Sequence, residues 1–259
     1  MNKKIRDSII GVIIIVVMLF LVIWVYNREA NKDTRELAKH ISELSSKGGP
    51  PETIEDLEKA IALYEAQIEL NIKDGIQTGS YWKILGIRQA DRGQHKSALE
   101  AYDNAKNYIT DDPTLFWLIG ESAIVAARSV VDVTPEALTE KDRYYKLAEN
   151  SYLRSIELDA VYGRPLFGIG ALYTFDLDRP AEAIPHLERF LQINTNNVTA
   201  MFVLARACYM EANSEGTGRG RALELNERAI ELYDRIISLS GDPKVREEAA
   251  KNKETIGNR

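Results

Sequence analysis

The chain of 259 residues is poor in the side chains that form disulfides or bind zinc, because it has one cysteine, Cys208, and three histidines. A single cysteine cannot close an internal disulfide or supply a zinc cluster. Positive charge is also scarce: 33 lysines and arginines stand against 39 aspartates and glutamates, which leaves a formal net charge of −6. No strong basic field is available to hold a nucleic-acid backbone. These shortages argue against metal and nucleic-acid binding.

The sequence also offers little that could carry out catalysis. His40, His95 and His186 are far apart in the sequence and lack metal-ligand spacing. The glycine-rich run 216–220 resembles a phosphate-binding loop, but no strand pattern precedes it and the Lys-Ser/Thr pair is missing. No nucleophile stands beside a base in a recognisable motif. We therefore expect no enzymatic activity, no cofactor and no metal site.

The longest apolar run, residues 9–26, contains no charged side chain. At about 1.5 Å per residue it reaches roughly 27 Å, close to the hydrocarbon thickness of a bilayer. A cleaved signal peptide usually has a shorter apolar core that ends in a small-x-small site. Here the run ends at Trp24 and Tyr26, aromatic residues typical of a membrane interface. The run is predicted to be an uncleaved transmembrane helix that binds the lipid bilayer.

The orientation of this helix depends on its short N-terminal tail, residues 1–8. That tail carries Lys3, Lys4 and Arg6. Long domains cross membranes largely regardless of their charge, so the short basic tail should decide and stay in the cytoplasm. This predicts a single-pass protein of the bacterial inner membrane whose large domain lies in the periplasm. A domain that faces the cytosol is the alternative.

The stretch GSYWKILGIRQADRGQHKSALEAYDNAKNYI resembles a tetratricopeptide repeat (TPR), a pair of helices that stacks on its neighbours. That family places large, small and aromatic residues at fixed positions of the two helices. The matching residues here are Trp82, Leu85, Gly86, Ala98, Tyr102 and Ala105.

The pattern recurs three times downstream, with a small residue in the first and in the second helix of each copy. Small residues let helix backbones approach closely. Three steps from a second helix to the next first helix span 22 residues, which predicts that these residues set the contact between successive units. The eight small residues are Gly86, Ala98, Gly120, Ala148, Gly170, Ala183, Ala205 and Ala229.

The predicted fold is all-α: a transmembrane helix followed by a superhelical TPR solenoid of about four to five repeats with a polar C-terminal capping helix. Residues 71–78 are predicted to be a loop, so that Ala60, Tyr64 and Gln67 belong to an earlier, degenerate repeat whose first helix is 34–44. Extra length in the second and fourth copies is predicted at the turn between their helices. The predicted segments are the basic tail 1–8, the membrane helix 9–26, a juxtamembrane helix and linker 27–51, the array 52–243 and the capping helix 244–259.

The TPR resemblance implies a concave groove lined by the first helix of each unit, which binds a peptide or another protein. Carried over to this sequence, an aromatic residue falls at the same groove position in three successive units. Such a stripe could hold a peptide, although it could equally belong to the core between repeats. The predicted groove residues are Lys83, Ile87, Trp117, Glu121, Arg164, Phe167, Phe202 and Arg206.

The resemblance and the anchor together favour a membrane-anchored protein–protein interaction scaffold or adaptor. Its predicted setting is bacterial cell-envelope assembly, secretion or a chaperone network. The alternative is a cytosol-facing anchored receptor that docks client proteins or peptides through the TPR groove. Self-association through the groove or the apolar run is a further interpretation. The scaffold itself serves many unrelated partners, so the sequence does not name one.

Overall fold

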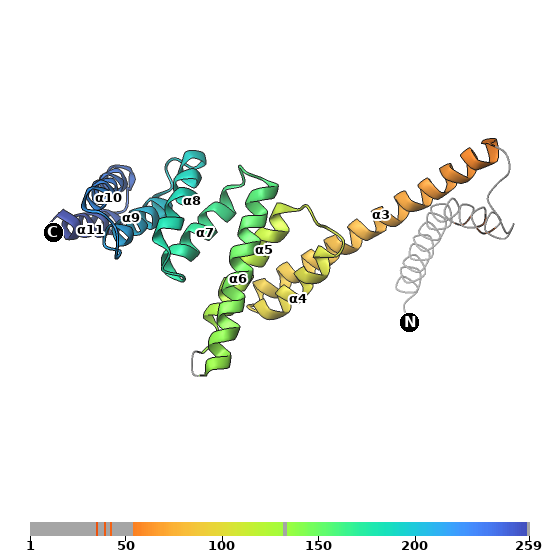
Figure 1. Cartoon of the computed structure of the whole chain (residues 1–259), viewed down its shortest axis with the longest axis horizontal. Coiled ribbons are helices and arrows are strands. Elements are labelled where there is room, and N and C mark those ends of the chain that lie inside the picture. The colour runs from red at the N-terminus through yellow and green to blue at the C-terminus, as the bar shows by residue number, and fades with distance from the viewer. Residues whose placement is uncertain (1–34, 36–38, 40–41, 43–53, 132–133, 258–259) are drawn as a thin grey trace, which may run out of the picture. The chain divides into compact units, whose positions relative to one another are not determined.

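A computed structural model of the chain describes residues 35, 39, 42, 54–131 and 134–257. The chain divides into two compact parts, Met1–Ile76 and Gln77–Arg259. The described residues form helices and no strand (Figure 1). The helices are α3 (Ile54–Asp91), α4 (His95–Lys106), α5 (Pro113–Arg128), α6 (Pro135–Leu158), α7 (Gly163–Phe175), α8 (Pro180–Ile193), α9 (Val198–Ala212), α10 (Arg219–Leu239) and α11 (Pro243–Gly257).

The predicted membrane helix, residues 9–26, lies outside the described residues, as do its flanking tail and most of the linker 27–51. Within the described ranges, no helix combines the length and the apolar character that crossing a bilayer requires.

The loop predicted at residues 71–78 is wrong, because α3 runs as one helix of 38 residues through that stretch. The stretch contains Gly75 but no proline. A glycine inside a helix costs about 1 kcal/mol relative to alanine, which weakens the helix without breaking it. Ala60, Tyr64 and Gln67 therefore share one helix with Gly86. They cannot form the separate second helix of an earlier repeat.

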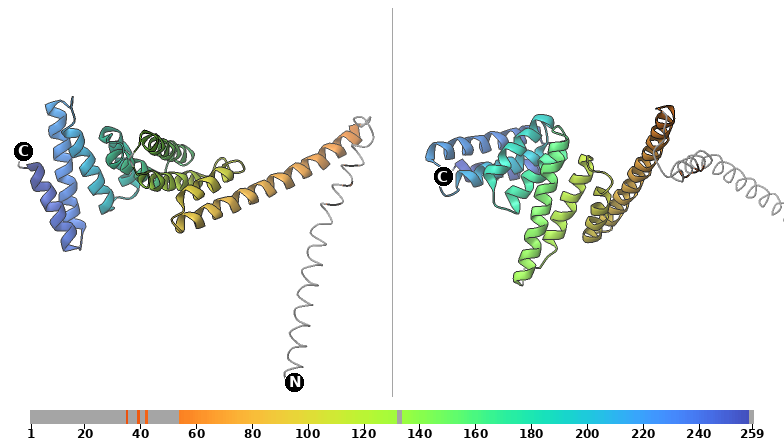
Figure 2. Two further views of the ribbon diagram at one scale, coloured as in Figure 1. Left: turned by 90° about the horizontal axis from the view of Figure 1, so that it is seen from below. Right: turned by 45° about the vertical axis from the view of Figure 1, so that its right-hand side comes forward.

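The C-terminal part is a stack of four helix pairs, each of which forms one repeat unit: the end of α3 with α4, then α5 with α6, α7 with α8, and α9 with α10. Gly86 of α3 lies against Tyr102 of α4, and from α4 onward each helix packs on the next along the chain. The C-terminal helices α9, α10 and α11 lie side by side in both views of Figure 2. The described part is therefore an all-α, TPR-like solenoid with four helix pairs and a closing helix.

Local sequence sets where the first helices begin and how the extra length is used. Asp112 accepts a hydrogen bond from the Thr114 amide at 2.8 Å, and Asn197 caps α9 in the same manner. Side-chain caps of this kind satisfy amides that a helix leaves unpaired at its start. Thr134 and Pro135 likewise start α6, which has 24 residues. The additional residues of the second repeat thus lengthen its second helix, α6. The sequence had predicted them at the turn between the two helices of that repeat.

The glycines of the first helices contact the second helix of their own unit. A Cβ atom built on Gly120 would lie 2.5 Å from the ring of Tyr152, and one on Gly170 would lie 2.5 Å from Leu187 Cγ. Gly86 lies against Tyr102 in the same way. These contacts join the two helices of one unit. The spacing of 22 residues had instead predicted that the small residues set the contact between successive units. The alanines of the second helices, Ala98, Ala148, Ala183 and Ala229, are all fully buried.

The contact between the second and third units depends on a glycine that the repeat pattern does not contain. A Cβ atom on Gly168 of α7 would lie 2.7 Å from Cζ of Tyr152, which belongs to α6. The Tyr152 ring therefore lies between Gly120 of its own unit and Gly168 of the next. Its side chain has no exposed surface, and its hydroxyl donates a hydrogen bond of 2.5 Å to Glu121.

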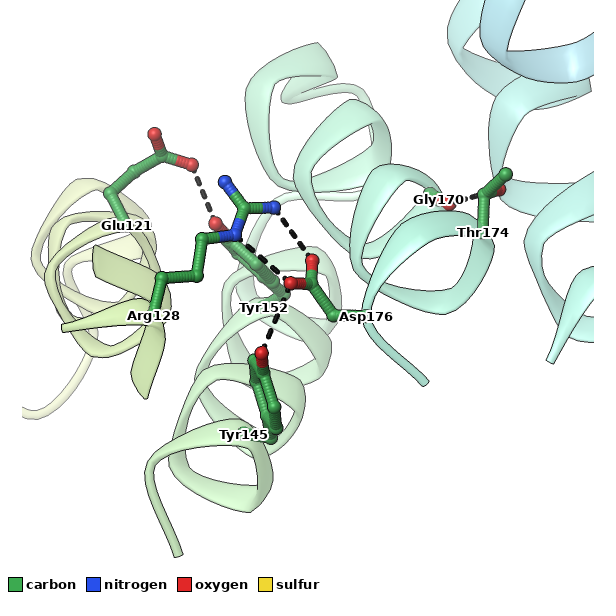
Figure 3. A network of polar contacts seen from close by, with 7 residues as sticks. All are labelled: Glu121, Arg128, Tyr145, Tyr152, Gly170, Thr174 and Asp176. Carbon is green, nitrogen blue, oxygen red and sulfur yellow. Dashed lines mark hydrogen bonds and ion pairs between the residues drawn. The ribbon is translucent and has the colours of Figure 1, made fainter. Parts of the chain in front are cut away.

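A polar network beside this ring joins three helices (Figure 3). The Arg128 guanidinium, at the end of α5, donates two hydrogen bonds to Asp176, at 2.9 and 2.7 Å. The Tyr145 hydroxyl of α6 donates to the same carboxylate at 3.1 Å. Asp176 directly follows α7. Bidentate arginine–carboxylate pairs fix geometry as well as adding energy, so this network sets how the second and third units meet.

Candidate functional site

A pocket of about 650 Å³ opens on the array between α7, α9, α10 and α11. Most of its lining is apolar, and five aromatic rings contribute: Phe167, Phe175, Phe202, Tyr209 and Tyr233. The polar side chains around it are Thr199, Arg206, Glu248, Asn252 and Thr255. A concave, mostly apolar pocket with a few polar groups is the usual form of a ligand site.

The stacking of the units explains why this pocket forms. α7 and α9 are the first helices of the third and fourth units, and they contact each other. α11 packs on α10 and so takes the place of a following first helix. Side chains on the inner faces of these helices therefore converge on one hollow, which ends at the C-terminal helix.

Two of the predicted groove aromatics line this pocket and contact the core at once. Phe202 meets Tyr233 with ring centroids 5.9 Å apart and planes at 62°. Phe167 meets Phe190 of α8 at 5.4 Å. Both phenylalanines are half-buried. The two interpretations of the aromatic stripe, groove or core, are thus not exclusive here, because both phenylalanines pack against the core and also line the pocket.

Arg206 brings a positive charge to the pocket wall. Its guanidinium lies 5.4 Å from the centre of the Phe175 ring, and the side chain is exposed. A cation over an aromatic face is attracted by the ring quadrupole, which orients the guanidinium. Burial raises the pKa of the neighbouring Tyr233, and the Arg206 charge opposes that rise. At neutral pH the tyrosine hydroxyl is therefore neutral.

The predicted groove residues of the first unit do not line this pocket. Lys83 forms an ion pair with Asp112 at 2.6 Å, across from α3 to the start of α5. Burial raises the pKa of Asp112, but the hydrogen bond from Lys83, the charge of Lys83 and backbone amides outweigh it and lower the pKa overall. Ile87 packs against the small core cluster around Tyr102. Lys83 therefore joins two repeats, and Ile87 belongs to the core.

The remaining candidates, Trp117, Glu121 and Arg164, also lie outside the pocket lining. Arg164 places its guanidinium 4.7 Å from the Trp117 ring centre. Trp117 in turn meets Tyr162 edge-on, with centroids 6.2 Å apart. Glu121 accepts the hydrogen bond from Tyr152. The structure thus brings Phe167, Phe202 and Arg206 together at one pocket and leaves the other five predicted residues apart from it.

The contribution of the C-terminal helix was not predicted from its sequence, whose polar composition indicated only a cap. Val245, Glu248, Asn252 and Ile256 of α11 line the pocket. Their spacing of three or four residues puts them on one helix face. That periodicity was readable in the sequence, but the stretch contains so few apolar residues that it indicated a solvated surface.

No family model matches the sequence. A curated protein of Borreliella burgdorferi (strain ATCC 35210 / DSM 4680 / CIP 102532 / B31), described as a TPR repeat-containing protein, is 26% identical over 165 residues. The match covers 61% of this chain and 67% of that protein. This relative supports the TPR resemblance.

Several solved structures are similar to this chain at low identity. MamA has a TM-score of 0.48 and 17% identity over 81% of this chain and 98% of that chain. YrrB, described as a TPR protein with an unusual peptide-binding site, has a TM-score of 0.49 and 18% identity over 86% and 96%. A thermophilic TPR protein of Thermus thermophilus, TTC0263, has a TM-score of 0.49 and 15% identity over 84% and 97%.

Proposed function

We propose that this chain is a non-enzymatic scaffold or adaptor that holds a segment of another protein in the pocket between α7, α9 and α11. The observation that carries the proposal is the pocket itself, about 650 Å³ in volume, with five aromatic rings in its lining. Half-buried aromatic side chains commonly act as anchors at protein interfaces, because they offer a large rigid surface to a partner. Their rings are already fixed by core contacts such as that of Phe202 with Tyr233.

The proposal extends to a membrane anchor at residues 9–26 and to an array in the periplasm of a bacterium. The uncharged run and the basic tail before it support the anchor and its orientation. The bacterial source of the curated relative supports the setting. A single membrane helix would keep the array near machinery of envelope assembly, secretion or chaperone action.

Crosslinking in intact cells tests the pocket. A photo-reactive amino acid replaces Glu248 in the full chain. The proteins crosslinked to this chain are compared with those crosslinked when the chain also carries Thr199→Trp or Phe202→Ala. Thr199 is exposed at the pocket, so tryptophan there should fill the pocket without disturbing the core. We expect the yield of at least one crosslinked protein to fall roughly tenfold in both variants, as is common when an interface anchor is removed.

The matched control is Tyr108→Ala, which removes an exposed aromatic ring from a site outside the pocket lining. It should leave the crosslinked proteins unchanged. If every crosslinked protein survives both pocket variants, the pocket is not the binding site.

Protease access tests the orientation. In spheroplasts with an intact inner membrane, we expect added protease to cleave the array, because the short basic tail should keep only residues 1–8 in the cytoplasm. Cleavage is read by immunoblot for the C-terminal helix, with a cytoplasmic marker protein as the control. Cleavage only after the inner membrane is opened would instead establish the cytosol-facing receptor.

A further inference from the structure

The two walls of the pocket carry opposite charges. Arg206 lies on α9 and Glu248 on α11, and both side chains are exposed in the pocket lining. Arg206 stacks on Phe175. In the part of the chain that the structure describes, no carboxylate forms an ion pair with Arg206. Glu248 likewise has no ion-pair partner among those residues. The pocket is therefore apolar at its centre and has a positive and a negative side.

Several other arginines of the array are paired. Arg128 binds Asp176, Arg179 binds Glu149 and Glu182, and Arg228 lies near Glu188 and Glu231. Arg206 instead stacks on the Phe175 ring beside apolar surface. Its planar guanidinium keeps its N–H donors available for a ligand. A guanidinium in this state is suited to a carboxylate, which it can bind with two parallel hydrogen bonds. Arg164 stacks similarly on Trp117 but lies outside the pocket lining.

The opposite wall restricts where that carboxylate can lie. The negative charge of Glu248 repels a second carboxylate placed near α11. Asn252 of the same helix is uncharged and brings no positive charge to this wall. An acidic group is thus favoured on the α9 side of the pocket and disfavoured on the α11 side.

Resting on the proposed function, we infer that the pocket binds an internal apolar segment of a partner protein that carries one aspartate or glutamate side chain. The apolar side chains enter between Phe167, Phe202 and Tyr233, and the carboxylate pairs with Arg206. The residue that faces Glu248 is neutral or basic. The chemistry of a side chain fits better than that of a chain terminus, because capture of a terminal carboxylate typically uses several converging donors. Arg206 is the one cationic side chain among the described lining residues.

Peptide display on the purified full chain in detergent tests this inference. The library displays random dodecapeptides whose C-termini are joined to the carrier, so that no free terminal carboxylate is present. Peptides that bind the unchanged chain but not the Phe202→Ala variant define the pocket-dependent set. We expect that set to combine apolar residues with one Asp or Glu. The same selection on Arg206→Glu should replace the acidic residue with Lys or Arg.

Binding of one selected peptide, amidated at its C-terminus, gives the quantitative readout by fluorescence polarisation. Changing its acidic residue to the amide, or Arg206→Gln in the chain, should each weaken binding by roughly tenfold, the usual effect of losing a charge-assisted hydrogen bond. The two changes together should weaken it little further. Arg221→Gln, an exposed arginine outside the pocket, is the control and should have no effect.

The outcomes separate this inference from the proposed function. Pocket-dependent peptides without an acidic residue would overturn the inference and leave the scaffold proposal standing. A second library with free C-termini is selected in parallel. Peptides whose binding requires Phe202 and that appear only in the second library would overturn the choice of a side chain and leave the scaffold proposal standing. If neither library yields a peptide whose binding requires Phe202, both proposals fail.

Discussion

Replacing Tyr152 with alanine is expected to lower the free energy of unfolding of the array by about 4 kcal/mol, in the range of large-to-small changes at buried aromatics. The side chain has no exposed surface and fills the space between α5, α6 and α7. Gly120 and Gly168 face its ring and have no side chain that could move into the cavity. The cavity should therefore stay largely unfilled, which keeps the loss within the range for buried aromatic side chains.

Urea unfolding followed by far-UV circular dichroism measures this effect. Tyr152→Phe keeps the ring and removes the hydrogen bond to Glu121, which should cost only about 1 kcal/mol. Tyr108→Ala removes an aromatic ring that is 46% exposed, and should change stability by less than about 0.5 kcal/mol. If Tyr152→Ala proves as mild as Tyr108→Ala, the ring does not join the two units.

A valine at Gly168 is expected to destabilise the array by about 3 kcal/mol, at the upper end for overpacking a close contact. The first added carbon would lie 2.7 Å from Cζ of Tyr152, well inside van der Waals contact. The ring cannot retreat, since Gly120 of α5 lies against it as well. Valine branches at Cβ, so it brings two further carbons into the same space. The third unit should therefore separate from the second or tilt against it.

Gly220 provides the matched control, because a Cβ atom there meets nothing within 4 Å. Both glycines lie in helices, α7 and α10. Gly168→Ala should destabilise while Gly220→Ala should stabilise by up to about 1 kcal/mol, the difference in helix propensity. Combining Gly168→Val with Tyr152→Ala should cost less than the sum of the two changes, because they act at one contact. Full additivity, or equal effects of the two alanines, would contradict the proposed packing.

The part of the fold that the sequence predicted rests on residues whose environment is local. Gly120 and Tyr152 belong to one helix pair, and so do Gly170 and Leu187, so each of these contacts forms within a single pair. The groove positions of the third and fourth units came from the TPR resemblance, which is how the sequence predicted Phe167, Phe202 and Arg206 as groove residues. The same resemblance also predicted Lys83, but Asp112 holds Lys83 at the joint between two repeats.

The sequence could not decide whether a helix stops at a glycine or continues through it. Gly75 has the same local chemistry in a turn as in the middle of α3, and the difference of about 1 kcal/mol is small against the packing energy of a helix face. It also could not show that Tyr152 is covered by Gly168, because that contact joins residues of different units.

By itself the sequence determined the all-α repeat architecture of the array, because helix periodicity and the placement of small residues are properties of each helix pair alone. Only the tertiary structure decided which candidate residues share a pocket, since this depends on the stacking of one unit upon the next. α11 shows the reason most clearly: its few apolar side chains look like a solvated surface in isolation, and they become a pocket wall because α10 positions them beside α9.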